Sequence, residues 1–190
     1  MDNLGQHVRD LLEGDDGKVG AAASAVKELS MEAENRHRLF QEDGLVGGLT
    51  AVIEKACPAT ADAVVAIHNI SDVRSEGGVT EKALYDFEGG RLFRAIRKVI
   101  QGENSSDMVA IENGLLFIKN IARNTDSVCA ALFSQEGLLG ELLKTVKKEG
   151  EEYKVAREYA LVAMGNITFG GPEVKKGMFE YEGLMSCLVK

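Results

Sequence analysis

The chain has 190 residues, of which 45% are apolar and 27% are charged, as is typical of a folded globular domain. Its net charge of −8 argues against nucleic-acid binding, because affinity for a phosphate backbone comes largely from Lys and Arg. No apolar run approaches the ~20 residues of a membrane helix, and residues 1–5 lack the features of a signal peptide. We therefore expect a protein of the cytoplasm, with the nucleus as the alternative, and no membrane insertion.

Apolar residues recur at helical spacing along the chain, and no stretch alternates strictly between apolar and polar residues. This pattern predicts an all-α fold. Both prolines, Pro58 and Pro172, stand where a helix could begin, since proline is tolerated at the first helical position. In chain order, helices are expected over residues 2–13, 18–31, 33–43, 45–56, 58–72, 78–88, 90–102, 106–123, 125–136, 138–149, 152–168, 172–182 and 184–190.

A five-residue pattern, with an aromatic residue first, an acidic residue fourth and glycine last, recurs at near-constant spacing. The steps between its glycines are 45, 48 and 46 residues, which predicts a stack of repeated supersecondary units. Each glycine can adopt the left-handed conformation that ends a short helix, and the aromatic residue is expected to anchor that helix in the core. The four copies are Phe40–Gly44, Tyr85–Gly89, Phe133–Gly137 and Phe179–Gly183.

A second repeated feature runs in phase with the first. One position, called the ladder position here, is occupied by Glu28, Asn69, Asn120 and Asn166 in successive units. A small residue always stands six positions earlier, and an apolar residue stands two positions earlier and one position later. These offsets fall on one face of a helix, and the small residue lets a neighbouring helix approach closely. The small residues are Ala22, Ala63, Gly114 and Ala160.

We interpret residues 1–190 as a single domain of stacked units. A partial unit at residues 1–17 precedes full units at 18–56, 57–103 and 104–150, and a truncated unit follows at 151–190. Each full unit holds a short helix, a second helix after the repeated glycine, and a third helix with the ladder position. Since solenoids normally end in polar capping units, an apolar last unit would indicate a piece of a longer array or self-association through the C-terminal end.

The sequence resembles the armadillo-repeat family. The family pattern has Asn-[Leu/Ile]-[Ala/Ser] late in the third helix and Gly-[Leu/Ile] at the start of the second, as in Asn69-Ile70-Ser71 and Gly44-Leu45 here. The resemblance extends from about residue 18 to residue 190. It implies a right-handed α-solenoid of about four three-helix repeats with incomplete ends, whose third helices line a concave groove.

The resemblance also implies a function as a non-enzymatic protein–protein interaction module. In importin-α and β-catenin, the repeated asparagine bonds the backbone of an extended peptide, as a carboxamide can both donate and accept. Importin-α also places Trp four residues before each asparagine, where this chain has Ser24, Val65, Leu116 and Val162, so nuclear import is not favoured. The candidate contacts for a protein or peptide partner are Asn69, Asn120, Asn166, Asn113, Phe117, Asn124, Tyr159 and Glu28.

Two alternatives stay open. The asparagines could instead cap a neighbouring helix or bond across repeats. The chain could also be a structural segment of a longer armadillo protein, such as an adaptor, a small-GTPase regulator or a co-chaperone, without a ligand of its own.

We found no motif for catalysis, phosphate binding or metal binding. The three histidines are far apart, and the three cysteines fit neither a disulfide framework nor a metal spacing. We therefore expect no enzymatic activity, no catalytic residue, no metal and no cofactor.

Overall fold

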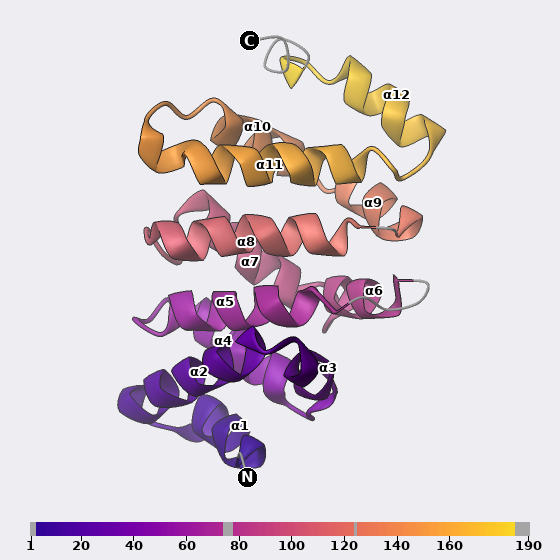
Figure 1. Cartoon of the computed structure of the whole chain (residues 1–190). Helices are drawn as coiled ribbons and strands as arrows, with labels where there is room; N and C mark the ends of the chain where they lie inside the picture. Colours follow the sequence, from indigo (N-terminus) through magenta and orange to yellow (C-terminus); the bar gives the residue numbers. More distant parts are fainter. Residues whose placement is uncertain (1–2, 74–77, 124, 185–190) are drawn as a thin grey trace.

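The computed structural model describes residues 3–73, 78–123 and 125–184, and these residues are helical with no strands (Figure 1). The helix predicted over residues 184–190 lies outside the described residues except for its first residue. The elements are α1 (Leu4–Glu13), α2 (Asp16–Met31), α3 (Ala33–Gln41), α4 (Leu45–Lys55), α5 (Thr60–Ser71), α6 (Val79–Asp86), α7 (Arg91–Gln101), α8 (Met108–Ile121), α9 (Asp126–Phe133), α10 (Leu138–Val146), the 3₁₀ turn η2 (Glu151–Tyr153), α11 (Lys154–Ile167) and α12 (Pro172–Glu180).

Each described helix lies where the apolar pattern predicted one, with most ends one to three residues inside the expected range. The helices form three repeating types. The short helices are α3, α6, α9 and α12, the second helices are α1, α4, α7 and α10, and the third helices are α2, α5, α8 and α11. No described helix is long and apolar enough to cross a membrane.

The third helices form one continuous layer. Figure 1 shows α2, α5, α8 and α11 stacked one above another in front, with the second helices α4, α7 and α10 behind them. Consecutive third helices pack directly against one another, and each also packs against the second helix that precedes it in the chain. The molecule is therefore a solenoid in which each unit contacts mainly its neighbours.

The glycine before each of α4, α7 and α10 has the left-handed conformation that the sequence pattern predicted. Gly44 and Gly137 both have φ of 80° and cap the N-termini of α4 and α10. In the second unit this role belongs to Gly90, with φ of 83°, rather than to Gly89. Glu88 takes a positive φ of 45° as the chain accommodates the additional residue. With Gly90 in place of Gly89, the steps between these glycines become 46, 47 and 46 residues.

The aromatic residues of the repeated pattern are covered by the following unit. Phe40 lines a depression together with Leu84 of α6, and it packs against the core. The ring of Phe133 lies over Gly177 of α12, where an added Cβ would clash with the ring. Phe179 departs from the predicted anchoring role, because its side chain is exposed and no described unit follows α12.

The core lies where the third helices meet the second helices. The small residues six positions before the ladder position are all buried, and Gly114 lies against Ile96 and Ile100 of α7. The apolar residues two positions before it are buried as well, namely Val26, Ile67, Ile118 and Met164. The repeated columns of the sequence are therefore the contact faces of the stacked helices.

The column of small residues can be tested by enlarging one of them. Ala63 is fully buried, and Ala63→Leu should lower the free energy of unfolding by about 1–3 kcal/mol through overpacking. The control Ala21→Leu, on an exposed position of α2, should change it by less than about 0.5 kcal/mol. Urea unfolding followed by circular dichroism measures both, and equal stability of the two variants would contradict the close packing.

Candidate binding surface on the third helices

The ladder asparagines bond to the preceding third helix. The Nδ2 atom of Asn69 donates to Ser30 Oγ at 3.0 Å, and that of Asn120 donates to Ser71 Oγ at 3.1 Å. The Nδ2 atom of Asn166 donates to the carbonyl oxygen of Lys119 at 2.8 Å. All the acceptors lie near the C-terminal end of the helix before. The structure therefore shows the bonding across repeats that was one of the two interpretations of the ladder.

The two serines explain why the acceptor changes along the ladder. Each stands two positions after the ladder position, and its Oγ donates at 2.6 Å to the carbonyl oxygen three residues earlier. The third unit has Ala122 at that place, so Asn166 reaches the equivalent carbonyl, that of Lys119, directly. The last carbonyls of a helix have no intrahelical partner, which makes them available for such bonds.

A second row of contacts joins the same helices. In each pair, one residue stands one position before the ladder position of its own helix. The other stands on the next third helix, seven positions before the ladder position of that helix. Lys27 Nζ lies 2.8 Å from Asp62 Oδ1, and Lys119 Nζ lies 5.9 Å from the ring centroid of Tyr159. The polar groups of this surface are therefore largely paired between units, which fixes the side chains that a ligand would meet.

The predicted contact residues differ in their accessibility. Asn120 is 1% exposed and Phe117 is fully buried, so neither side chain lies on the surface, which corrects their assignment as groove contacts. Phe117 is apolar and contributes to the core instead. Asn124 lies outside the described residues. Glu28 is exposed, with its carboxylate 3.8 Å from Lys27 Nζ, and the partly exposed candidates are Asn69, Asn113, Tyr159 and Asn166.

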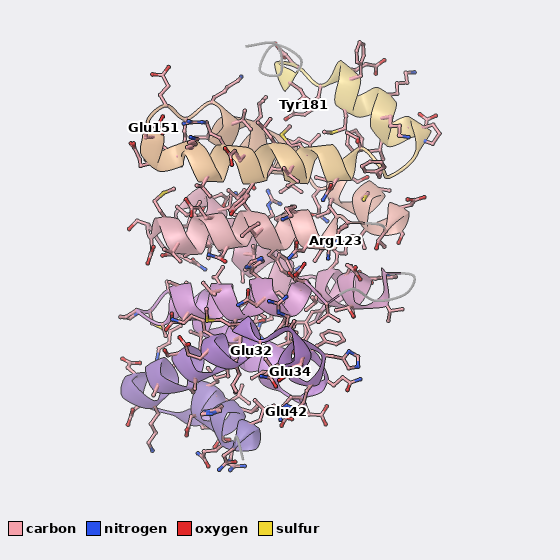
Figure 2. All side chains as sticks on the ribbon, in the orientation of Figure 1. Glu32, Glu34, Glu42, Arg123, Glu151 and Tyr181 are labelled. Carbon is pink, nitrogen blue, oxygen red and sulfur yellow. The ribbon has the colours of Figure 1, made fainter. Side chains whose placement is uncertain are left out.

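Ion pairs at the position three residues after the ladder position join three consecutive units. Asp72 accepts from Arg36 of α3 at 2.9 Å and from Arg123, which follows α8, at 3.2 Å. Figure 2 places Arg123 at the end of the third-helix layer nearest the short helices. This arrangement orients the Arg123 guanidinium at the edge of the surface.

A depression of about 300 Å³ opens between α8, α9 and α11. It is lined by Ala122, Arg123, Asp126, Asn166 and Phe169. Phe169 is 62% exposed, so an aromatic ring is available to a ligand beside the Asn166 carboxamide. Sequence reasoning missed Arg123 and Phe169, because the residue three positions after the ladder position is not repeated, and it also missed Asp126 at the start of α9.

His68 is a largely buried histidine at the centre of the surface. Burial lowers the pKa of its imidazole to about 4, although the neighbouring Asn113 acts in the opposite direction. Its Nδ1 atom has no hydrogen-bond partner among the described residues. His68 is therefore neutral at pH 7. The equivalent positions of the first and third units, also one residue before the ladder position, hold the charged residues Lys27 and Lys119.

The other sequence candidates for chemistry are structural. Cys129 is buried, burial raises the pKa of its thiol, and its Sγ lies 2.9 Å from the carbonyl oxygen of Ala122. Within residues 3–73, 78–123 and 125–184, no three His, Cys, Asp or Glu residues are grouped as metal ligands.

Comparison with known proteins identifies the fold. No family model and no curated protein sequence matches the chain. A designed armadillo repeat protein in complex with the peptide (KR)4 has a TM-score of 0.76 at 22% identity, over 99% of this chain and 73% of that chain. An engineered protein has a TM-score of 0.77 at 20% identity, over 100% of this chain and 71% of that chain. This similarity confirms the predicted right-handed, armadillo-like repeat fold.

The buried asparagine of the ladder should contribute to stability. Asn120→Ala removes the donor to Ser71 Oγ, and we expect the free energy of unfolding to fall by about 1–2 kcal/mol. The control is Val109→Ala, at an exposed position of the same helix, which should cost less than about 0.5 kcal/mol. Urea unfolding compares the two, and an equal loss in both would contradict a role for Asn120 in stacking.

Burial of His68 should make stability depend on pH. Between about pH 6.5 and pH 4, the unfolded chain binds a proton at His68 that the folded chain does not. The folded state should therefore lose about 2–3 kcal/mol from this group as the pH falls through that range. His68→Gln cannot titrate, so its stability should fall less steeply between pH 7 and pH 4. Parallel curves for the two proteins in urea unfolding would contradict this account.

Proposed function

We propose that the chain is a non-enzymatic interaction module that binds an extended segment of another protein along the third-helix surface, centred on α8 and α11. The observation that carries the proposal is the depression beside Asn166, which combines a carboxamide, a guanidinium and an exposed aromatic ring. Aromatic residues and Arg are the types that contribute most binding energy in protein interfaces.

The carboxamide oxygen of Asn166 is available to a ligand. Its Nδ2 donates to the carbonyl oxygen of Lys119, whereas no described residue donates to its Oδ1. A carboxamide oxygen can accept the N–H of any peptide group, whatever the side chain. Asn166 can therefore hold a backbone while Arg123 and Phe169 select side chains.

The geometry of the stack suits an extended ligand. Packed helices lie about 8–10 Å apart, and an extended chain advances about 3.3 Å per residue, so each unit would meet two to three ligand residues. The designed neighbour that binds (KR)4 shows that this fold can hold a peptide. Val65 and Leu116 stand four positions before the ladder position here, and their partly exposed side chains favour apolar ligand residues.

A structural role without a ligand is the second candidate. The bonds of Asn69 and Asn120 to the preceding third helices favour it, because these amides serve the stacking of units. The two candidates predict opposite results for a selection of binding peptides.

Random peptides displayed on phage and selected on the whole chain test the proposal. Enriched peptides, resynthesised with a fluorescent label, should bind the wild-type chain and lose at least about tenfold in affinity with Asn166→Ala/Phe169→Ala. Polarisation measures the affinity, and a (KR)4 peptide serves as a purely charged control.

Phe179→Ala is the matched variant, because Phe179 is an equally exposed aromatic residue on α12 and outside the proposed surface. It should bind the selected peptides as the wild type does. A selection without enrichment, or enriched peptides that bind all three proteins equally, would contradict the proposal and favour the structural role.

A further inference from the structure

The turns that follow the short helices α6, α9 and α12 each hold a cation of this chain. After α6, Arg94 Nη1 donates to the carbonyl oxygen of Gly89 at 2.7 Å. After α9, Arg97 Nη2 donates to the equivalent carbonyl oxygen, that of Glu136, at 3.1 Å. In both turns the acceptor is the residue just before the left-handed glycine. After α12, Lys147 Nζ lies beside the equivalent glycine.

The turn of the first unit, between α3 and α4, lacks such a cation. Its equivalent carbonyl oxygen belongs to Asp43, and no described residue donates to it. A Cβ on the neighbouring Gly44 would meet two apolar side chains of α1, and Gly48 stands where the second unit has Arg94. The neighbours of this turn, α1 and α6, are both described. The missing cation therefore follows from the sequence of the first unit itself.

A depression of about 340 Å³ beside this turn offers aromatic surface. It lies between α3, α4 and α6, and Phe40 and Phe87 line it. Phe87 lies over Gly47, which has no side chain to fill the space. In the second unit the equivalent depression, of about 330 Å³, is lined by Arg94 itself. The first depression is therefore a place where the chain holds an arginine in one unit and none in another.

The charges around the depression favour a cation. The acidic residues Glu42, Asp43 and Glu88 line it, and none of the described residues that line it is basic. Glu88 is already paired, since its carboxylate lies 2.8 Å from Arg91 Nη1. The carboxylates of Glu42 and Asp43 have no ionic partner among the described residues. Two carboxylates and one backbone carbonyl oxygen are therefore available as acceptors.

We propose that this depression binds an arginine side chain of a partner protein, which supplies the cation that the first unit lacks. Its guanidinium would donate to the Asp43 carbonyl oxygen, as Arg94 and Arg97 do in the following turns, and to the carboxylate of Glu42. The guanidinium is planar and stacks on aromatic faces, so Phe40 and Phe87 favour arginine over lysine.

This site is separate from the proposed peptide-binding surface. Figure 2 places Glu42 well apart from Arg123, which lines the depression beside Asn166. The two sites use different residues and different partner groups, so either proposal can fail without the other.

Nuclear magnetic resonance of the isotope-labelled whole chain tests the proposal. The probe is a capped tripeptide of alanine, arginine and alanine. We expect saturable shifts of the amide signals of residues 40–47 and 83–88, with a dissociation constant on the order of 1 mM. The matched probe has citrulline in place of arginine, which keeps the shape and removes the charge. It should bind at least about fivefold more weakly, because hydrogen bonds to charged groups are the stronger ones.

Three variants locate the contact. Ala83 is an exposed residue of α6 that lines the depression, so Ala83→Phe should fill it and remove the saturable shifts without disturbing the core. The double variant Glu42→Gln/Asp43→Asn should weaken binding about 5- to 10-fold. The control Glu136→Gln changes the residue equivalent to Asp43 in a turn that Arg97 already occupies, and it should bind as the wild type does.

Four results would overturn the proposal. The first is the absence of saturable shifts at residues 40–47 and 83–88, including the case where the shifts gather around Asn166 instead. The second is equal binding of the arginine and citrulline probes, and the third is unchanged binding to the Ala83→Phe variant. The fourth is self-association of the chain in analytical ultracentrifugation that Ala83→Phe removes, because a second copy would then supply the arginine.

Discussion

The hydrogen bond from the ladder carboxamide to the preceding third helix is the interaction on which the rest of the structure depends. The buried Asn120 amide joins α8 to the C-terminal end of α5, and Asn69 and Asn166 do the same one unit earlier and one unit later. A buried carboxamide needs such a partner, because an unsatisfied polar group in the core is costly. The bond therefore fixes how far each third helix can slide along its neighbour.

The binding surface follows from this stacking. When the third helices are in register, Lys27 meets Asp62, Lys119 lies over Tyr159, and Arg123 is oriented by Asp72. The nitrogen of each ladder carboxamide serves the fold, and where the side chain is partly exposed, its oxygen stays on the surface. Structural and recognition roles of the ladder are therefore compatible within one side chain.

Most of the fold could be predicted from the sequence because its signals are local. The helical spacing of apolar residues predicted the helices, and the repeated glycines predicted the junctions between short helices and second helices. The junction was misplaced by one residue where two glycines are adjacent, because only Gly89 fits the pattern whereas the backbone uses Gly90 as the cap of α7. The exposed Phe179 could not be predicted either, since its environment depends on the following unit rather than on its own motif.

The site was harder to predict because its contacts join distant residues. Whether an asparagine bonds to a serine hydroxyl or to a carbonyl depends on the residue at the end of the preceding third helix, 39 to 49 residues away. The burial of Phe117 and Asn120 depends on the neighbouring helices in the same way. Arg123 and Phe169 carried no signal, because their position holds a different residue type in every unit.

The Asn120 amide tests the central claim most directly, because its Nδ2 lies 3.1 Å from Ser71 Oγ and 3.5 Å from the carbonyl oxygen of His68. In Ser71→Ala the amide should bond to that carbonyl oxygen, as Asn166 does beside Ala122, so urea unfolding should show a loss of less than about 0.5 kcal/mol. Asn120→Ala should cost about 1 kcal/mol or more in the wild type and in the Ser71→Ala background alike, because it removes the donor in both. A cost below about 0.3 kcal/mol in both backgrounds would show that the amide does not hold α5 and α8 in register, and would contradict the account.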